Sequence, residues 1–310
     1  MTVSDKEKFV IAGLGELIWD LLPTGKRLGG APSNFAQISA LLGDSGVIAS
    51  RVGNDQNGAE ALAALSGNGI SIEYIQLDSE HPTGTVGVTI GEHGEPKFLV
   101  NQNSAWDYLE FPTSWKTLAT RVDAVCFGTL GQRHPKARHT IKQFLKATRP
   151  DCLRIFDVNL RHSFFTRALL EDSLNHASIV KLNHEEIVQV GALLDCLKTS
   201  ERSIGTLLID KFTIELVAIT HGPVGCSLIS GTEVIEHHGF ESKVVDTIGA
   251  GDAFTAMLAH LYLRNFSLKE IAEKANRMGA WMTMQCGATP VISREELPIE
   301  LKKLQAKTRN

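Results

Sequence analysis

The chain has 310 residues, of which 43% are hydrophobic and 6% aromatic, enough to bury a large core in one large α/β domain or two ordinary ones. Its formal net charge is −4, its isoelectric point is about 6.3 and its Lys and Arg residues are scattered, which argues against a nucleic-acid partner. Five widely spaced cysteines without a Cys-X-X-Cys pair predict buried free thiols rather than a disulfide framework or a zinc site.

The N-terminal residues 1–15 place acidic side chains before a very short apolar run, which is not the pattern of a secretory signal. The longest apolar stretch, Ala253–Leu263, is too short to cross a bilayer. We therefore expect a soluble protein in the cytoplasm, with no membrane partner.

Short apolar runs recur along the chain and are separated by longer segments with helical periodicity. Such runs are typical of strands that are buried on both faces of a parallel sheet. The segments between them, such as Pro135–Thr148 and Phe164–His176, are each long enough for one helix. The pattern predicts an α/β fold with a doubly wound, mostly parallel sheet flanked by helices. The runs are Phe9–Ala12, Val47–Ala49, Ala124–Phe127, Leu153–Phe156, Ile179–Leu182 and Ile214–Ile219.

Two regions depart from this pattern. Leu14–Arg27 contains a Pro-Thr-Gly turn between apolar flanks, and Thr85–Val100 alternates apolar and polar residues on both sides of a Gly-Glu-His-Gly turn. Both are typical of antiparallel hairpins, which we expect to pair as a small sheet. The simplest organisation is one domain over residues 1–310, with lid segments at about 14–28 and 85–105.

Polar clusters follow several predicted strands, at the sheet edge where open α/β folds bind their ligands. Asp157 and Arg161 follow one strand, Asn183 and Glu186 the next, and the segment Thr220–Gly225 a third. A single cluster of this kind is more simply explained as a helix cap or a turn. Several clusters at one edge favour a binding site.

The segment Asp246–Asp252 has the sequence Asp-Thr-Ile-Gly-Ala-Gly-Asp and leads directly into the apolar segment Ala253–Leu263, which predicts a buried helix. Gly249 and Gly251 would leave backbone N–H groups bare at the start of that helix, where the dipole favours anions such as phosphate. A carboxylate at Asp252 is then explained by proton acceptance beside a transferring phosphoryl group. The alternative is that Asp252 only caps the helix.

Nearer the N-terminus, Gly29–Asn34 has the sequence Gly-Gly-Ala-Pro-Ser-Asn and precedes a predicted helix at Phe35–Leu42. Paired glycines let backbone approach a ligand closely, and the Asn34 amide can both donate and accept hydrogen bonds. Gly-Gly-X-Pro is also a common turn.

Together these motifs resemble the ribokinase-like carbohydrate kinases of the pfkB family, across essentially the whole chain. Gly29–Asn34 is similar to the first family signature, and Asp246–Asp252 matches the second, DTxGAGD. Asn183–Glu186 matches the N-x-x-E motif, and Thr220–Gly225 matches T-x-G-x-x-G. The resemblance implies a central sheet flanked by helices, a β lid over the sugar, and ATP lying along the C-terminal half.

The resemblance also implies residue roles. Asp252 is the expected catalytic base, with an anion hole at Gly249, Ala250 and Gly251 and with Arg161 beside the γ-phosphate. The expected sugar ligands are Asp20, Gly30, Asn34, Arg161 and Asp252. The expected nucleotide residues are Asn183, Glu186, Thr220, Gly222, Gly225, Gly249, Gly251 and Asn276, with Glu186 holding Mg²⁺ through water. A monovalent cation such as K⁺ is expected at Asp246, Ile248 and the 285–287 backbone including Gly287; ribokinases often carry Ser at the position of Val291. Many relatives form homodimers through the lid.

The segments Phe156–Arg161, Phe127–Arg133 and Ala105–Asp107 most resemble the fructokinase branch, so fructose is the first choice of substrate. Ribose, 2-keto-3-deoxygluconate, nucleosides and a non-catalytic, regulatory relative stay as alternatives. A nicotinamide-dependent dehydrogenase is excluded because the third small residue of the dinucleotide fingerprint would fall at Ile18. A P-loop kinase is excluded because Gly25-Lys26 lacks the following Ser or Thr.

Overall fold

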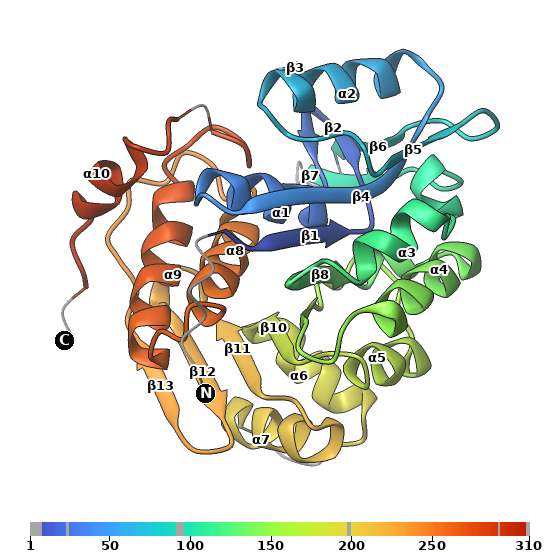
Figure 1. The fold of residues 1–310 in the computed structure, drawn as a ribbon. Helices are drawn as coiled ribbons and strands as arrows, with labels where there is room; N and C mark the ends of the chain where they lie inside the picture. The colour runs from blue at the N-terminus through green and yellow to red at the C-terminus, as the bar shows by residue number, and fades with distance from the viewer. Residues whose placement is uncertain (1–7, 23–24, 91–95, 197–199, 291, 308–310) are drawn as a thin grey trace.

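The computed structural model describes residues 8–22, 25–90, 96–196, 200–290 and 292–307, which form two sheets and the helices around them (Figure 1). The strands are β1 Val10–Leu14, β2 Ile18–Leu22, β3 Gly25–Gly29, β4 Ser45–Gly53, β5 Ile75–Asp78, β6 Gly84–Ile90, β7 Pro96–Val100, β8 Ala124–Gly128, β9 Leu153–Asp157, β10 Ile179–Asn183, β11 Leu216–Thr220, β12 Cys226–Ser230 and β13 Val234–His237. The α-helices are α1 Ala31–Leu41, α2 Gln56–Gly67, α3 Thr113–Ala119, α4 Pro135–Ala147, α5 Arg167–Leu174, α6 His184–Leu193, α7 Glu201–Phe212, α8 Ala250–Tyr262, α9 Leu268–Met282 and α10 Leu297–Lys302.

The main sheet has the strand order β13-β12-β11-β10-β9-β8-β1-β4-β5. Neighbours from β5 to β11 run parallel, whereas β12 and β13 pair antiparallel at one edge. The chain leaves β1 toward β4 on one side and later returns to β8 on its other side. This reversal between β1 and β8 is a topological switch point, where open α/β sheets form their ligand crevice.

Two apolar cores cover the two faces of the main sheet. Helices α3 to α7 pack on one face, with Trp115 and Phe144 fully buried in that core. Helices α1, α8 and α9 pack on the other face, and α8 is apolar on nearly all sides because it lies between the sheet, α1 and α9. The N-terminal ends of α1 and α8 are therefore held side by side against the sheet.

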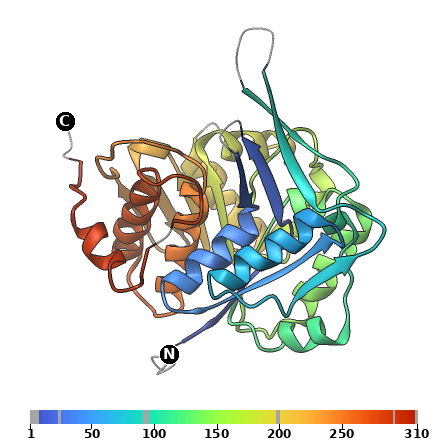
Figure 2. The same cartoon turned by 90° about the horizontal axis from the view of Figure 1, so that it is seen from above.

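The small sheet has the order β3-β2-β6-β7, with antiparallel pairs β2–β3 and β6–β7 joined by a parallel pair β2–β6. In Figure 1 it lies beside α2, and Figure 2 shows it from above. Its inner face packs Ile18 and Val86 against the fully buried Trp106. Trp106 thus anchors the small sheet to the main body.

The predicted fold class and strand runs are confirmed, and several boundaries differ. Helix α1 begins at Ala31 rather than Phe35, because Pro32 occupies its first turn without needing an N–H partner. Helix α5 begins only at Arg167, where Thr166 caps it. The hairpin turns expected at 23–24 and 91–94 lie outside the described residues, as does Val291.

The prediction of buried cysteines is wrong for Cys286, which is exposed, and for the partly exposed Cys196. All five cysteines are free thiols, as expected. Within the described residues, no helix is long and apolar enough to cross a membrane.

Candidate active site

Asp252 lies in the first turn of α8, where the structure joins it to the first turn of α1. The Asn34 side-chain amide donates a 2.7 Å hydrogen bond from Nδ2 to Asp252 Oδ2. The two residues are far apart in sequence and meet because α1 and α8 pack together. Asp252 keeps part of its surface exposed, so a ligand can reach it.

The protein raises the pKa of Asp252 to about 6. Burial of the carboxyl group is the largest cause, and the nearby negative charge of Asp157 adds to it. The Asn34 hydrogen bond and the positive charges of Lys181 and Arg161 act in the opposite direction. Near pH 7 the group is mostly ionised, yet it accepts a proton more readily than an ordinary aspartate.

A buried ion pair lies behind the start of α8. Lys181 Nζ is 3.1 Å from Asp157 Oδ1, and Thr255 on α8 donates from Oγ1 to Asp157 Oδ2 at 3.2 Å. Burial lowers the pKa of Lys181, but Asp157, Glu186 and Asp252 raise it above its ordinary value, so Lys181 stays charged. A Cβ at Gly251 would lie 2.9 Å from Lys181 Nζ, which places this cation directly against the glycine loop.

The loop before α8 is fixed from both ends. Asp246 Oδ1 accepts the N–H of Ile248 at 3.0 Å, and Asp246 Oδ2 accepts the N–H of Gly287 at 3.1 Å. Gly249 caps the helix at φ 77°, and a Cβ there would lie 2.5 Å from the Cβ of Ala288. Only glycine fits this position. The first N–H groups of a helix have no carbonyl partner in that helix and can serve an anion, as the predicted anion hole requires. In the structure the Ala250 N–H donates to the Thr247 carbonyl oxygen at 3.3 Å.

Three of the predicted sugar ligands, Asp20, Gly30 and Asn34, lie where the small sheet meets α1. A Cβ at Gly29 would be 2.6 Å from Asp20 Oδ2, and a Cβ at Gly30 would be 2.4 Å from the Glu16 carbonyl oxygen, so both glycines are needed for close packing. Burial, followed by the charge of Asp246, raises the pKa of Asp20 to about 6. Arg161 is exposed, and its charge acts on Asp252.

Of the residues predicted to bind the nucleotide, Asn183 and Glu186 form a capping box at the start of α6. Asn183 Oδ1 accepts the Glu186 N–H at 2.8 Å, and Glu186 Oε2 accepts the Asn183 N–H at 2.9 Å. Glu186 Oε1 also accepts the N–H of Leu160 at 2.9 Å. The helix-capping alternative is therefore correct for Asn183, which leaves its Nδ2 group available for a ligand.

Thr220 lies beside Asn183 because β10 and β11 pair in that register. Gly222 is exposed, whereas Gly225 is buried at φ 115°, with a would-be Cβ 1.7 Å from the His237 carbonyl oxygen. Asn276 is only 8% exposed and donates from Nδ2 to Cys226 Sγ at 2.9 Å and to the Ala272 carbonyl oxygen. Its donor is thus used within the protein.

Two buried charged residues of this region were not predicted. Lys181 lies inside an otherwise apolar strand, and a lysine there is a signal because it needs a buried partner. Glu16 follows β1 and is 2% exposed. Burial raises the pKa of Glu16 to about 7, and the charge of Asp252 adds to the rise.

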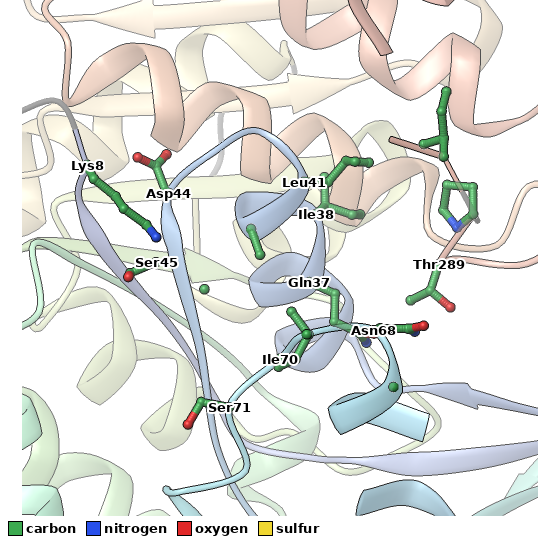
Figure 3. Close-up of a pocket in the computed structure, with 16 residues that line it drawn as sticks. Lys8, Gln37, Ile38, Leu41, Asp44, Ser45, Asn68, Ile70, Ser71 and Thr289 are labelled. Atoms are coloured by element: carbon green, nitrogen blue, oxygen red, sulfur yellow. The ribbon is translucent and has the colours of Figure 1, made fainter. Parts of the chain in front are cut away.

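A separate pocket of about 550 Å³ lies behind α1 (Figure 3). It is lined by Gln37 and Leu41 of α1, by Asn68 after α2 and by Thr289, and it contains none of the predicted site residues. A second pocket, of about 340 Å³, lies between β3 and the 286–289 segment and includes Gly287. Among the described residues, no group of three or more His, Cys, Asp or Glu side chains could hold a metal ion.

Residues 7–294 match the model of the pfkB family of carbohydrate kinases. A sugar kinase of Pyrococcus horikoshii is 29% identical, covering 93% of this chain and 94% of the relative. Its crystal structure in complex with ATP, of an enzyme described as uncharacterized, superposes with a TM-score of 0.81 over 94% of this chain and 99% of that one. The fructokinase of Escherichia coli is 30% identical, covering 93% of this chain and 97% of the relative. The chain therefore belongs to the pfkB family of carbohydrate kinases, whose members transfer a phosphoryl group to an alcohol.

Proposed function

We propose that this carbohydrate kinase is an ATP-dependent fructokinase in which Asp252 is the catalytic base. The observation that carries the proposal is the 2.7 Å hydrogen bond between Asn34 and Asp252. It joins the first signature, which faces the small sheet, to the carboxylate at the mouth of the buried helix α8. A sugar held by Asn34 would then present its hydroxyl to Asp252.

In this proposal Asp252 acts by position more than by basicity. A sugar hydroxyl is a weak acid, and in a loose transition state it becomes acidic only as its oxygen bonds to phosphorus. The carboxylate therefore accepts the proton late, through a hydrogen bond that is already in place. The pKa of about 6 helps, because the group is ionised near neutral pH and is a stronger acceptor than an ordinary aspartate.

Charge on the transferring group is met by the backbone N–H groups of Gly249, Ala250 and Gly251 and by Arg161. Lys181 adds a fixed positive charge behind Gly251, with Asp157 holding it in place. Such groups stabilise developing charge most when they are arranged beforehand in a water-poor site.

We assign the nucleotide to Asn183, Thr220, Gly222 and Gly225, which is supported by their shared edge of the sheet and by the relative solved with ATP. In this proposal Asn276 does not contact the nucleotide but supports these residues from the protein interior, since its amide is hydrogen-bonded to Cys226.

Mg²⁺, when bound with ATP, would neutralise phosphate charge. Both oxygens of Glu186 already accept backbone N–H groups, so this residue suits contact through water rather than direct ligation. Asp246 with the backbone of Ile248 and Gly287 is the proposed place for a monovalent cation such as K⁺, and it stays a prediction.

We further propose that the chain acts as one domain with the small sheet as a lid. Closure over the sugar would exclude water, which otherwise competes with the sugar for the phosphoryl group. The outer face of this sheet carries Leu21 and Leu99, which are 40% and 57% exposed and lie in register across Gly87. This apolar strip supports the predicted homodimer through the lid. The cytoplasmic location stays a prediction.

Fructose is supported by the fructokinases among the relatives and by the charge of the site. Asp20, Asp252 and Glu16 surround the proposed sugar position with carboxyl groups whose pKa values are raised. In their ionised forms these carboxyl groups disfavour an anionic substrate such as 2-keto-3-deoxygluconate, because like charges within a poorly solvated site repel. The predicted sugar ligand Arg161 acts in the opposite direction. Ribose and nucleosides are neutral and remain open by this argument.

The test is a panel of sugars and nucleosides with ATP and Mg²⁺, assayed for ADP release, with the wild type and Asp252→Asn. We expect fructose to give the highest kcat/KM, and Asp252→Asn to lower kcat at least ~100-fold while ATP still binds. A higher kcat/KM with another sugar would overturn fructose but keep the kinase. Near-normal turnover by Asp252→Asn would overturn the role of Asp252.

A further inference from the structure

Glu16 occupies the switch point of the main sheet, and the proposed function gives it a share in the acidic lining but no contact with the sugar. It lies between β1 and β2, and its side chain reaches the loop that follows β8. A Cβ at Gly131 would be 3.1 Å from Glu16 Oε2. Because β1 and β8 are the strands that diverge in chain order, this carboxyl group lies in the crevice where such sheets bind ligands.

The Glu16 carboxyl group is only half satisfied. The backbone N–H groups of Glu16 and of Ala31, the first residue of α1, lower its pKa, so both donors lie close to the carboxyl group. The oxygen Oε2 is buried and has no hydrogen-bond partner. A buried charged oxygen without a partner is costly, so natural proteins keep one mainly where a ligand completes it.

A second unpaired acceptor lies in the same site. Among the described residues, the buried side-chain oxygens that lack a hydrogen-bond partner are Glu16 Oε2 and Asn34 Oδ1. Asn34 Nδ2 donates to Asp252, and the Glu16 carboxyl group lies near the N–H of Ala31, at the N-terminus of the helix that carries Asn34. Two unpaired hydrogen-bond acceptors near the N-terminus of α1 favour a ligand that carries several hydroxyl donors.

We infer that Glu16 Oε2 binds a hydroxyl group of the sugar other than the one that is phosphorylated, and that Glu16 thereby positions the sugar against Asn34 and Asp252. This inference rests on the proposed sugar kinase activity but not on the choice of fructose. In its ionised form Glu16 Oε2 accepts a hydroxyl donor, so a neutral polyol fits this position, whereas the ionised carboxyl group repels a carboxylate or phosphate group.

A purely structural role for Glu16 makes a different prediction. If the carboxyl group served only to bind the N–H of Ala31, one of its oxygens would be enough for that role. The second oxygen, Oε2, would then be expected to contact a protein donor or solvent. Glutamine keeps the acceptor for Ala31 and replaces Oε2 by an NH₂ group, which cannot accept a hydroxyl donor. If the glutamine amide rotated by 180°, its NH₂ group would face the backbone N–H of Ala31, and these two donors would repel each other. Glu16→Gln therefore removes the proposed sugar contact and keeps the helix contact.

The experiment compares wild type and Glu16→Gln with whichever sugar the wild type phosphorylates best, and with its monodeoxy analogues. We expect Glu16→Gln to lower kcat/KM for the sugar by about 10- to 100-fold, since buried polar groups left unpaired reject a ligand strongly. The KM for ATP should stay the same. One deoxy analogue lacks the hydroxyl group that Glu16 binds, so the wild type and the variant should have equal kcat/KM for that analogue. The analogue for which the two values are equal therefore identifies the hydroxyl group.

The matched control is Asp44→Asn, which alters another buried carboxylate, bonded to Arg264 and His260 outside the site. It should lower the thermal midpoint and leave kcat/KM for the sugar unchanged. If Glu16→Gln behaves like this control, or if every deoxy analogue keeps the full difference between the two enzymes, the inference is wrong.

Gly131→Ala is the second variant, for use if Glu16→Gln does not fold. Its methyl group would lie 3.1 Å from Glu16 Oε2 and 3.1 Å from the Cα of Gly15, while Glu16 itself stays intact. We expect a higher KM for the sugar with an unchanged KM for ATP, and unchanged values of both would overturn the inference. If the wild type phosphorylates no sugar in the panel, the proposed function itself is refuted. This outcome is distinct from one in which the wild type is active and only the role of Glu16 is refuted.

Discussion

Replacing Asn34 by alanine tests how the site sets the acidity of its base. The Asn34 Nδ2 group donates to the charged form of Asp252, so its removal disfavours that form and raises the pKa of Asp252. A hydrogen bond to a charged group contributes about 1.5–3 kcal/mol, and about 1.4 kcal/mol corresponds to one pKa unit. Asp252 keeps partial exposure, and water can replace part of the lost bond. We therefore expect a rise of about 0.5 to 1 unit.

The assay is kcat/KM for the sugar at saturating ATP and Mg²⁺ between pH 5 and 9. Activity should fall as pH decreases through the pKa of Asp252, because the protonated carboxyl group cannot accept the hydroxyl proton. In Asn34→Ala this acid limb should lie at higher pH than in the wild type. Ionisation of the ATP phosphates affects both enzymes equally, so the difference between the two profiles belongs to the protein.

The control is Ser39→Ala, which removes a buried polar group from the same helix. The Ser39 hydroxyl donates to the Phe35 carbonyl oxygen and does not contact Asp252. The acid limb of the pH profile of Ser39→Ala should coincide with that of the wild type. An unchanged or lower midpoint in Asn34→Ala would refute the reasoning, since a lost donor cannot stabilise a carboxylate.

Two further substitutions test the loop and the charge behind it. Gly249→Ala places an alanine in the left-handed conformation, which costs about 1–2 kcal/mol, and presses its methyl group against Ala288, so kcat should fall at least ~10-fold. The control is Gly69→Ala: Gly69 also has a positive φ, 73°, but lies in open space, so this change should lower only the thermal midpoint. Lys181→Met leaves Asp157 buried without its cation and should destabilise the fold by about 3–5 kcal/mol in a urea titration. Adding Asp157→Leu should recover stability but not turnover, and recovery of both would refute the role of Lys181.

Much of the fold could be predicted because buried parallel strands must be apolar on both faces. This rule located β1, β4, β8, β9, β10 and β11. It could not locate β12 and β13, because these antiparallel strands at one end of the sheet, such as Cys226–Ser230, contain polar residues among the apolar ones. It also misplaced the start of α1, since Pro32 and Ser33 suit a turn as well as a first helical turn.

The candidate site was predictable where a short motif contains its own geometry. Gly249 and Asp252 lie in one string of residues, so their proximity follows from the chain itself. Glu16 could not be identified in this way, because a single acid before an apolar strand is common, and its burial depends on the distant Gly131. The sequence also could not show that Asn183 would use its side-chain oxygen for capping and keep its amide nitrogen free.

The concentration of acids in a site that receives phosphate groups has a physical consequence. After burial, the charge of Asp252 raises the pKa of Glu16, and the charge of Asp157 raises the pKa of Asp252. A base with a pKa of about 6 is ionised roughly ten to one at pH 7 and still accepts a proton about 100-fold better than one with the ordinary value of 3.8. Lys181 limits the rise by placing a cation on the opposite side of Gly251. Lys181 therefore opposes the charge of Asp157 and keeps the pKa of Asp252 lower than it would be beside Asp157 alone.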